Sequence, residues 1–447
     1  MLGIRNFENM FYYFLIILYC LLFVVLAVKN LKWAIYLVVF ALPSYLIRFE
    51  VAGLPMTLLE GMILILFAVW AVKKRRGGGN GFWAAKFLYI GIFIFLLSAT
   101  ISVFVALDSR AALGIWKAYF IEPVLFFVVF INTIRKEDCK NILSAMAGSV
   151  LVLTIVAFYQ KLTGDFISNA FWAAEATRRV GGVYPYPNAL ALYLAPIIIL
   201  LLGFWARQPL KGKKNCQNSK GELLHCHVVI LFRLVIIAVG LLVVYWTGSK
   251  GALLGILAGL VFYALFYKGY KKYFITAVIL MVLVGLFFIQ NGKINFKGNY
   301  QVEGGDSMSV RLEMWQEGWR MLLDRPVSGA GLGGYQAVME KYHERKYIEI
   351  YLYPHNIFLN FWSELGILGI LGILGILVWF YRVGFRIYQW SVVGGRWSVV
   401  LMATMTTIII YGLVDVPYFK NDLSVFFWIL IGLLIITSTR RKDQLGV

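Results

Sequence analysis

Long uninterrupted apolar runs dominate this sequence and restrict what the chain can fold into. Most are about as long as the roughly 20 residues that a helix needs to cross a bilayer. They lack the alternation of apolar and polar residues that marks the strands of a membrane β-barrel. We therefore expect an all-α polytopic membrane protein with about 12–13 transmembrane helices, since the first two runs are short enough to form one broken element. The runs lie near residues 11–28, 33–47, 56–72, 86–106, 118–134, 141–162, 188–205, 228–246, 251–267, 273–290, 357–380, 397–414 and 424–438.

The overall composition agrees with a membrane protein. Hydrophobic residues make up 61% of the 447 residues and charged residues only 14%, whereas soluble domains carry about 25% charged residues. A water-soluble fold is therefore excluded. The first apolar run leads directly into further runs, so we expect no cleavable signal peptide. The four cysteines, Cys20, Cys139, Cys216 and Cys226, imply no disulfide framework.

The distribution of basic residues predicts the orientation of the spans. Clusters of Lys and Arg recur with two spans between successive clusters, so all of them lie on one side of the membrane. By the positive-inside rule that side is cytosolic, which places the C-terminus in the cytosol and the long connection 291–356 outside. The clusters are Lys29/Lys32, Lys73–Arg76, Arg135–Lys140, Arg207–Lys220, Lys268–Lys272, Arg382–Arg396 and Arg440–Lys442.

The net charge of +20 therefore belongs to one membrane face. The connection 291–356 is balanced, with eight Lys and Arg residues against eight Asp and Glu residues. Orientation and anionic lipid headgroups explain a basic face of this kind, and we expect membrane lipid but no nucleic acid as a partner. We predict a multi-pass protein of the cytoplasmic (inner) membrane. It would have an N-terminal bundle (1–290), an extracytoplasmic loop (291–356) and C-terminal transmembrane helices (357–447).

The loop 291–356 is too long for a passive connector. A short helix with one apolar face is expected from about 309 to 323, and the Asp-Arg-Pro sequence at 324–326 should end it. The glycine-rich run 329–334 requires a positive φ or a close backbone approach. The residues that recur at helical spacing and form the expected apolar face are Leu312, Trp315, Trp319 and Leu322.

The span that follows the loop has two unusual features. Glycines recur at every third position, which favours close packing of helices. Glu364 lies about two turns into the span, where a charge is costly, and this predicts a polar cavity or an ion pair. The repeating glycines are Gly366, Gly369, Gly372 and Gly375.

His355 is the strongest candidate for chemistry. It follows a proline outside the membrane, precedes Asn356, and lies at the mouth of a span. An imidazole can exchange a proton near neutral pH, which suits a general base. The alternative is an interfacial histidine that hydrogen-bonds a neighbouring loop, and spacing alone leaves both interpretations open. His343, in a charged stretch, fits a solvated loop residue.

Several cations on the expected outer side are candidates for binding an anion. Arg178 and Arg179 precede a Gly-Gly turn and could bind phosphate through forked donors and free backbone N–H groups, or they lie at headgroup level. Lys250 directly precedes a span, where it either snorkels to the interface or faces a lipid-linked anion. Arg311 either binds phosphate or pairs with a loop carboxylate.

Metal and nucleotide chemistry are poorly supported. The histidines of His225–His227 lie near two cysteines, but the spacing matches no standard zinc pattern. The sequence has no Walker motif, dinucleotide fingerprint or HExxH motif. It also has no extracytoplasmic Asp-x-Asp, which argues against a metal-dependent glycosyltransferase. We therefore expect neither a metal nor a cofactor.

Four segments together resemble the O-antigen ligase and polymerase family of bacterial envelope proteins. They are RVGGVYPYPNALALYL (179–194), TGSKGALLGILAGL (247–260), RLEMWQEGWRMLLDRPVSGAGLGGY (311–335) and HNIFLNFWSELGILG (355–369). The resemblance implies a GT-C-like membrane glycosyltransferase that works on the outer side of the cytoplasmic membrane without metal or ATP. The implied donor is a glycan on undecaprenyl pyrophosphate. The implied acceptor is a hydroxyl of lipid A-core for a ligase, or of another lipid-linked unit for a polymerase.

The resemblance also implies roles for single residues. His355 matches the essential histidine that the family is thought to use as a general base. Arg179 matches an arginine thought to bind the pyrophosphate, and the family's second such arginine falls on Lys250. Lysine keeps the charge but loses the bidentate fork. Ligation, polymerisation and protein O-glycosylation all remain open.

Two other classes of function compete with a transferase. A flippase for lipid-linked glycans would have polar residues spread through many spans, whereas here the conspicuous residues gather at one face. An assembly factor of the envelope would tolerate His355→Ala. A transferase instead requires His355, Arg179 and Lys250 to converge on one site, and all three are predicted on the same side of the membrane.

Overall fold

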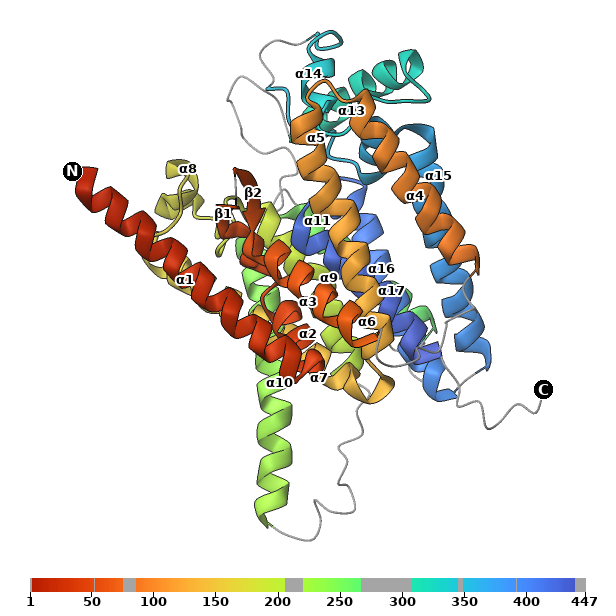
Figure 1. The fold of residues 1–447 in the computed structure, drawn as a ribbon. Coiled ribbons are helices and arrows are strands. Elements are labelled where there is room, and N and C mark those ends of the chain that lie inside the picture. Colours follow the sequence, from red (N-terminus) through yellow and green to blue (C-terminus); the bar gives the residue numbers. More distant parts are fainter. Residues whose placement is uncertain are drawn as a thin grey trace. The chain divides into compact units, whose positions relative to one another are not determined.

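The computed structural model describes residues 2–51, 53–74, 86–205, 220–266, 307–344, 349–390 and 392–438. Helices dominate these residues (Figure 1), and eight of them are long and apolar enough to cross a membrane, with two shorter apolar helices besides. The all-α polytopic fold is thus confirmed. The expected span at 273–290 lies outside the described residues, as do the basic clusters at 268–272 and 440–442.

The contacts of the chain group it into two units. Unit 1 comprises Met1–Trp83, Lys117–Ser249 and Tyr418–Val447, and unit 2 comprises Ala84–Trp116 and Lys250–Pro417. Each unit combines segments that are distant in the sequence. The predicted division of the chain at 290 and 356 remains a prediction.

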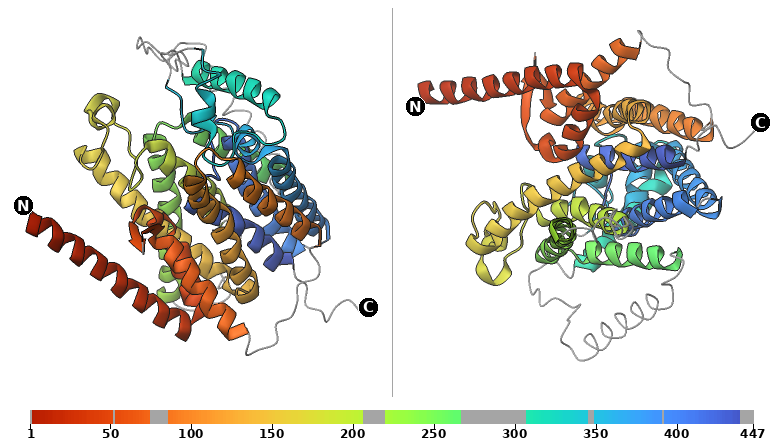
Figure 2. Two further views of the ribbon diagram at one scale, coloured as in Figure 1. Left: turned by 45° about the horizontal axis from the view of Figure 1, so that its top comes forward. Right: turned by 90° about the horizontal axis from the view of Figure 1, so that it is seen from below.

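Unit 1 is built around its most buried helices, α9 and α17, whereas α1 is largely exposed and extends away from them (Figure 2). Apolar side chains on such a helix are expected to face lipid. The elements of unit 1 are α1 (Leu2–Lys29), α2 (Leu31–Phe40), η1 (Leu42–Leu46), β1 (Arg48–Val51), β2 (Leu54–Thr57), α3 (Leu58–Lys74), η3 (Lys117–Ile121), α6 (Glu122–Thr133), η4 (Lys136–Asp138), α7 (Cys139–Thr163), α8 (Ala170–Ala173), η5 (Glu175–Thr177), α9 (Pro187–Trp205), α10 (Lys220–Trp246) and α17 (Asn421–Ser438).

The second expected span does not reach the length of a bilayer. Asn30 separates α1 from α2, and its side-chain oxygen accepts the Trp33 N–H at 3.3 Å as an N-cap. Pro43 then lies in the short helix η1, and the chain turns into the antiparallel hairpin of β1 and β2. The first two apolar runs are therefore separate helices, of which the second is only 10 residues long.

In unit 2, α4 packs along α15, and α16 packs on both α15 and α11 (Figure 1). The close approach depends on glycine, because a Cβ at Gly372 would lie 3.0 Å from the Phe95 backbone and one at Gly369 would lie 3.0 Å from Ser98 Oγ. The predicted packing role is thus confirmed for these two glycines, while Gly375 has open space beside it. The elements are α4 (Lys86–Val105), α5 (Ser109–Trp116), α11 (Lys250–Phe266), α13 (Ser307–Asp324), α14 (Tyr335–Met339), α15 (Ile357–Trp390) and α16 (Val392–Gly412).

Helix α15 is broken at Gly366, where φ is 71° and ψ is −170°. A Cβ at this position would collide with the carbonyl oxygen of Val327, so the glycine-rich loop lies directly against the break. A broken helix exposes backbone groups that lipid cannot satisfy. Here these groups find other partners. Two serines of α4 donate to backbone carbonyls beside the break, Ser98 Oγ to Leu365 O at 2.8 Å and Ser102 Oγ to Glu364 O. The glycine-rich loop adds two backbone bonds, Ala330 N–H to Ser363 O at 2.6 Å and Ile367 N–H to Val327 O at 3.1 Å.

The buried carboxylate of Glu364 has a structural explanation at the same place. Its Oε2 accepts the backbone N–H of Gly333 at 2.5 Å, so the carboxylate binds the glycine-rich run. The sequence predicted a polar cavity or an ion pair for this residue; the partner is instead a backbone N–H group, which no side-chain pattern could reveal. A carboxylate that accepts a backbone N–H bond avoids part of the cost of burial.

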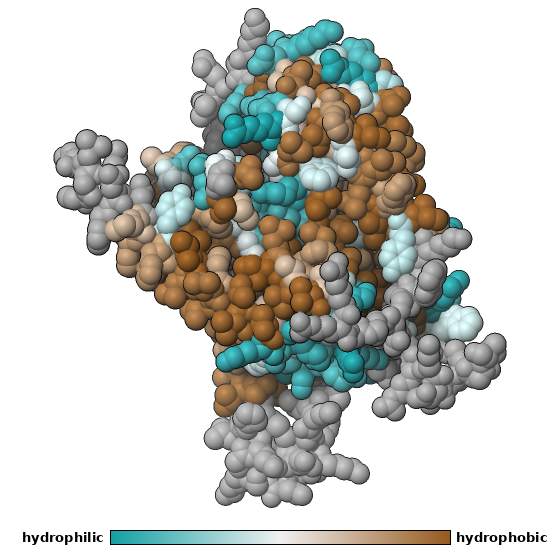
Figure 3. All heavy atoms as spheres, viewed as in Figure 1, coloured by the Kyte–Doolittle hydropathy of each residue, from teal (hydrophilic) through white to brown (hydrophobic). Residues whose placement is uncertain are grey.

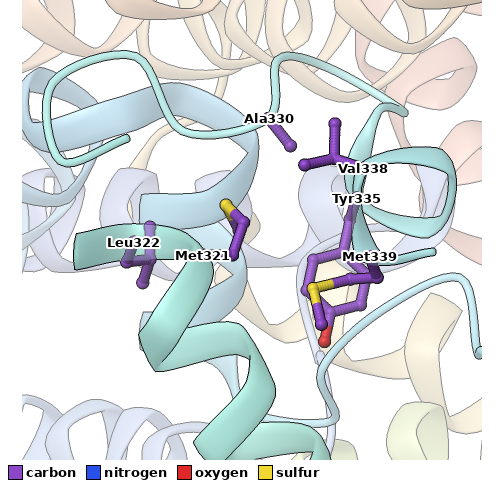
Figure 4. Packing of buried hydrophobic residues seen from close by; sticks show 6 residues of the cluster. All are labelled: Met321, Leu322, Ala330, Tyr335, Val338 and Met339. Carbon is purple, nitrogen blue, oxygen red and sulfur yellow. The ribbon is translucent and has the colours of Figure 1, made fainter. Parts of the chain in front are cut away.

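Residues 307–344 and 349–356 form a cap on unit 2. Its small core lies between α13 and α14 and includes Met321 and Leu322 of α13 and Tyr335 and Met339 of α14 (Figure 4). In Figure 3, hydrophobic side chains cover the surface of α4, whereas hydrophilic ones are concentrated over the cap and have hydrophobic ones among them. The cap is held together by an apolar core of its own.

The predicted helix 309–323 is present as α13, but its apolar face was only partly right. Leu322 is buried as expected, whereas Leu312 and Trp319 are exposed, and the buried side is completed by Met314 and Met321. Helix α13 therefore carries apolar side chains on two sides, and only one of these sides packs inside the cap.

Candidate functional site

His355 lies at the end of the cap, immediately before α15, with a backbone φ of 46°. Left-handed backbone is uncommon for a residue with a side chain, although histidine tolerates it better than most residues. Such strain costs about 1–3 kcal/mol and concentrates at functional sites. The residue before it is also fixed, because the Pro354 carbonyl accepts the indole N–H of Trp315 at 2.9 Å.

Two neighbours orient the imidazole of His355. Its Nδ1 is buried without a hydrogen bond and lies 3.4 Å from Oδ1 of Asp415, with which it forms an ion pair when the imidazole is protonated. The ring of Tyr351 meets it edge-on with centroids 5.4 Å apart. A carboxylate beside Nδ1 favours the tautomer with a proton there, which leaves Nε2 as the acceptor.

Asn356 connects the His355 loop to the end of α16. Its Oδ1 accepts the N–H groups of Phe358 at 3.0 Å and Leu359 at 3.2 Å, so it caps α15. Its Nδ2 donates to the Leu413 carbonyl at 3.2 Å. Because both ends of the amide make bonds within the protein, these contacts favour a positioning role over the predicted substrate contact.

Lys250 is the first residue of α11 and is exposed. The next residue, Gly251, packs against the end of α16, where an added Cβ would lie 2.7 Å from Val414 and 2.8 Å from the Tyr411 ring. Asp415 directly follows Val414 in the chain. Within unit 2, the structure thus brings the start of α11 and the His355 loop to the same end of α16.

Arg179 belongs to unit 1 and is half-buried. Its Nε donates to the Thr247 carbonyl at 2.7 Å and its Nη2 donates to Asn188 Oδ1 at 3.2 Å. Its guanidinium lies over the Trp172 ring, 5.7 Å from the centroid. Thr247, whose carbonyl binds Arg179, precedes Lys250 by three positions. Thr247 and the second predicted cation therefore belong to one short segment of the chain.

A buried glutamine fixes the turn that carries Arg179. The Oε1 of Gln160, in α7, accepts the N–H groups of Gly181 at 3.1 Å and Gly182 at 2.8 Å, and its Nε2 donates to the Gly182 carbonyl at 2.8 Å. In the same turn Tyr184 donates to Asp422 at 2.8 Å. Burial and the Asp422 charge raise the pKa of Tyr184 well above its usual value, so its hydroxyl stays a donor.

Arg178 has a different environment from its neighbour. Its Nη1 donates to the carbonyls of Lys161 at 3.0 Å and Leu162 at 3.2 Å, and its Nε donates to the Ala173 carbonyl at 3.1 Å. The Lys161 and Leu162 carbonyls lie at the end of α7 and the Ala173 carbonyl at the end of α8, where carbonyls lack partners within the helix. The contacts of Arg178 favour a capping role rather than the predicted substrate contact.

Arg311 is half-buried on α13, one helical turn before Trp315. Residues four apart share a helix face, and the Trp315 indole bonds the carbonyl of Pro354. Arg311 therefore lies on the side of α13 that faces the His355 loop.

His343, predicted as solvated, instead lies largely buried with Nδ1 3.2 Å from Glu317 Oε2.

Two residues of these arrangements, Asp415 and Gln160, were not identified as candidates from the sequence. Asp415 follows the predicted span 397–414 on the outer side, and a carboxylate at the mouth of a span was the available signal. Gln160 lies near the end of an apolar run, but nothing in its spacing indicates the turn that it binds.

Among the described residues there is no cluster of three or more His, Cys, Asp or Glu side chains that could hold a metal ion. Cys216 and the side chains of His225–His227 lie outside the described part.

Comparison with known proteins assigns one part of the chain to a family. A comparison with curated proteins returned no match. Residues 234–374 match the family model described as O-antigen ligase (Wzy_C). This range contains Lys250, Arg311, His355 and Asn356. The resemblance of the chain to the O-antigen ligase and polymerase family is thus confirmed over residues 234–374.

Proposed function

We propose that this protein transfers a glycan from undecaprenyl pyrophosphate to a sugar hydroxyl on the outer face of the cytoplasmic membrane. The O-antigen ligase domain links the chain to ligation or polymerisation of surface polysaccharide in general. The observation that carries the finer proposal is the His355–Asp415 contact, because a strained histidine beside a carboxylate has the geometry of an oriented base.

In this mechanism His355 removes the proton from the acceptor hydroxyl. The Asp415 carboxylate lies beside Nδ1 and favours a proton there, so Nε2 takes the proton of the hydroxyl while the hydroxyl oxygen forms a bond to the anomeric carbon. The bond from that carbon to the phosphate oxygen breaks, and its electron pair leaves with the carrier pyrophosphate. Fixed cations stabilise such a leaving group most where charge develops, and we assign this role to Arg179 and Lys250. Arg311 is a further candidate for contact with the anion.

The test is transfer by the purified protein in lipid nanodiscs. A donor of undecaprenyl-pyrophosphate-linked glycan and a glycan or lipid-linked acceptor are supplied without metal or ATP, and product and released carrier are measured together. Equal amounts of longer glycan and free undecaprenyl pyrophosphate are expected. If the same protein in sealed vesicles moves the donor across the membrane without forming any new glycosidic bond, the result would support a flippase and contradict the proposal.

Arg179→Ala tests the role of the cations. We expect it to raise the donor concentration needed for half-maximal rate, because the guanidinium is assigned to the carrier pyrophosphate. Arg178→Ala is the matched control, and any effect it has should be on thermal stability rather than on donor dependence. An unchanged donor dependence in Arg179→Ala would remove this residue from the site.

Glycan profiles of a gene deletion distinguish the forms of the reaction. If glycan attachment is lost while lipid-linked chains are retained, the protein is a ligase. If only single repeat units are found, the protein is a polymerase.

A further inference from the structure

Helix α13 of the cap carries an exposed apolar stripe formed by Leu312, Trp319 and Leu323. Their spacing of seven and then four residues aligns them on one side of the helix. The side chains are 46%, 47% and 66% exposed, respectively. The core of the cap uses the opposite side of α13, around Met314 and Met321. Large apolar side chains exposed together on one side of a helix are unfavourable in water and mark a surface that contacts something apolar.

The stripe continues into the lipid-facing surface of α15. Val327, just beyond α13, is 71% exposed, and its carbonyl accepts the N–H of Ile367 at 3.1 Å. Leu368 and Leu371, the next apolar side chains along α15, are exposed on a helix long and apolar enough to cross the membrane. Val327 thus lies between the stripe and the exposed apolar side chains of a helix that is long and apolar enough to cross a membrane.

Tryptophan contacts fix α13 in this position. Trp319 meets Trp362 edge-on with centroids 5.6 Å apart, and the Trp362 indole N–H donates to the Pro326 carbonyl at 2.7 Å. Trp362 lies in the second turn of α15, and tryptophan side chains favour the boundary between lipid and water. On a different side of α13, Arg320 forms an exposed ion pair with Glu344, as expected for a side that faces water.

We propose that α13 is an interfacial helix whose Leu312–Trp319–Leu323 stripe lies in the leaflet on the cap side of the membrane, in contact with phospholipid acyl chains. A helix with one charged and one apolar side lies in this plane and buries the apolar side at the boundary of headgroups and acyl chains. The cap core occupies the remaining side of α13. The cap therefore rests on lipid, and the His355 loop, which Trp315 of the same helix holds through Pro354, is kept at the membrane surface.

Spin labels measure this contact directly. Single cysteines replace Leu312 or Leu323 in a protein whose native Cys20, Cys139, Cys216 and Cys226 are changed to serine, and the labelled protein is studied in phospholipid nanodiscs. Leu371→Cys serves as the lipid-facing control and Glu340→Cys, on the exposed surface of the cap, as the water-facing control. Power saturation is measured with oxygen, which concentrates in lipid, and with a nickel chelate, which stays in water.

We expect labels at positions 312 and 323 to be relaxed by oxygen and protected from nickel, as at Leu371. Nickel accessibility like that at Glu340 would overturn the proposal. Protection from both reagents would also overturn it, since it would mean that another protein or a second copy of this chain covers the stripe. The spin-label measurement does not involve transfer activity, so its failure and the failure of the proposed function are distinguishable.

Discussion

At the residue scale, the contacts of a side chain distinguish a candidate catalytic residue from residues that support the fold. His355 combines a strained backbone with an Asp415 contact, whereas Asn356 and Arg178 bond only to backbone groups in the contacts described above. The sequence indicated His355, Asn356 and Arg178 as candidates for a site, with His355 the strongest, but it did not indicate Asp415. Hydrogen-bond partners come from segments far apart in the chain, and a local pattern cannot supply them.

Asp415→Asn should lower the turnover number by about 10- to 100-fold, by analogy with the loss of a carboxylate that orients a metal-bound histidine. The amide keeps the shape of the side chain but removes the charge that favours a proton on Nδ1. The donor concentration for half-maximal rate should change little. The measurement is the rate of transfer in nanodiscs as a function of pH, and an unaltered pH profile with full activity would show that Asp415 does not act through His355.

Lys250→Arg should retain transfer activity, because arginine keeps the charge and adds a bidentate fork for phosphate. Lys250→Met removes the charge at similar length and should weaken donor use. Steady-state rates over a range of donor concentrations check both variants. A well-folded but inactive Lys250→Arg protein would count against a phosphate role.

At the scale of elements, the break in α15 is the feature that the sequence concealed. The glycine repeat predicted packing, and this holds at Gly369 and Gly372 because their neighbours come close. Gly366 belongs to the same repeat, yet it breaks the helix so that the glycine-rich loop can bond its free backbone groups. Glycines with the same spacing thus have two different roles, close packing and breaking of the helix. Only the segment that packs against each glycine distinguishes the two. The length and placement of most helices, by contrast, followed directly from the apolar runs.

Gly366→Ala should destabilise the protein strongly, because an alanine at a φ of 71° is strained and its Cβ would overlap the Val327 carbonyl. Gly375→Ala is the matched control in the same helix, where a Cβ has open space. Thermal unfolding in detergent compares them, and we expect a large loss of folded protein only for Gly366→Ala. Equal stability of the two variants would contradict the broken helix.

At the scale of the whole molecule, a set of apolar helices carries a cap with its own core, and the family match spans both kinds of structure. Composition and hydropathy were sufficient for the fold class because a bilayer imposes helices of a minimum length. The two units were beyond prediction, since each joins segments that are distant in the sequence.

The central claim is that His355 is the base of a glycan transfer, and replacing it by glutamine tests this most directly. His343→Gln is the matched control, since this histidine is held by Glu317 within the cap. Transfer from the undecaprenyl-pyrophosphate donor is measured in nanodiscs with equal amounts of folded protein. We predict that His355→Gln abolishes transfer while His343→Gln retains it; a His355→Gln protein that transfers glycan at the rate of the unmodified protein would contradict the account.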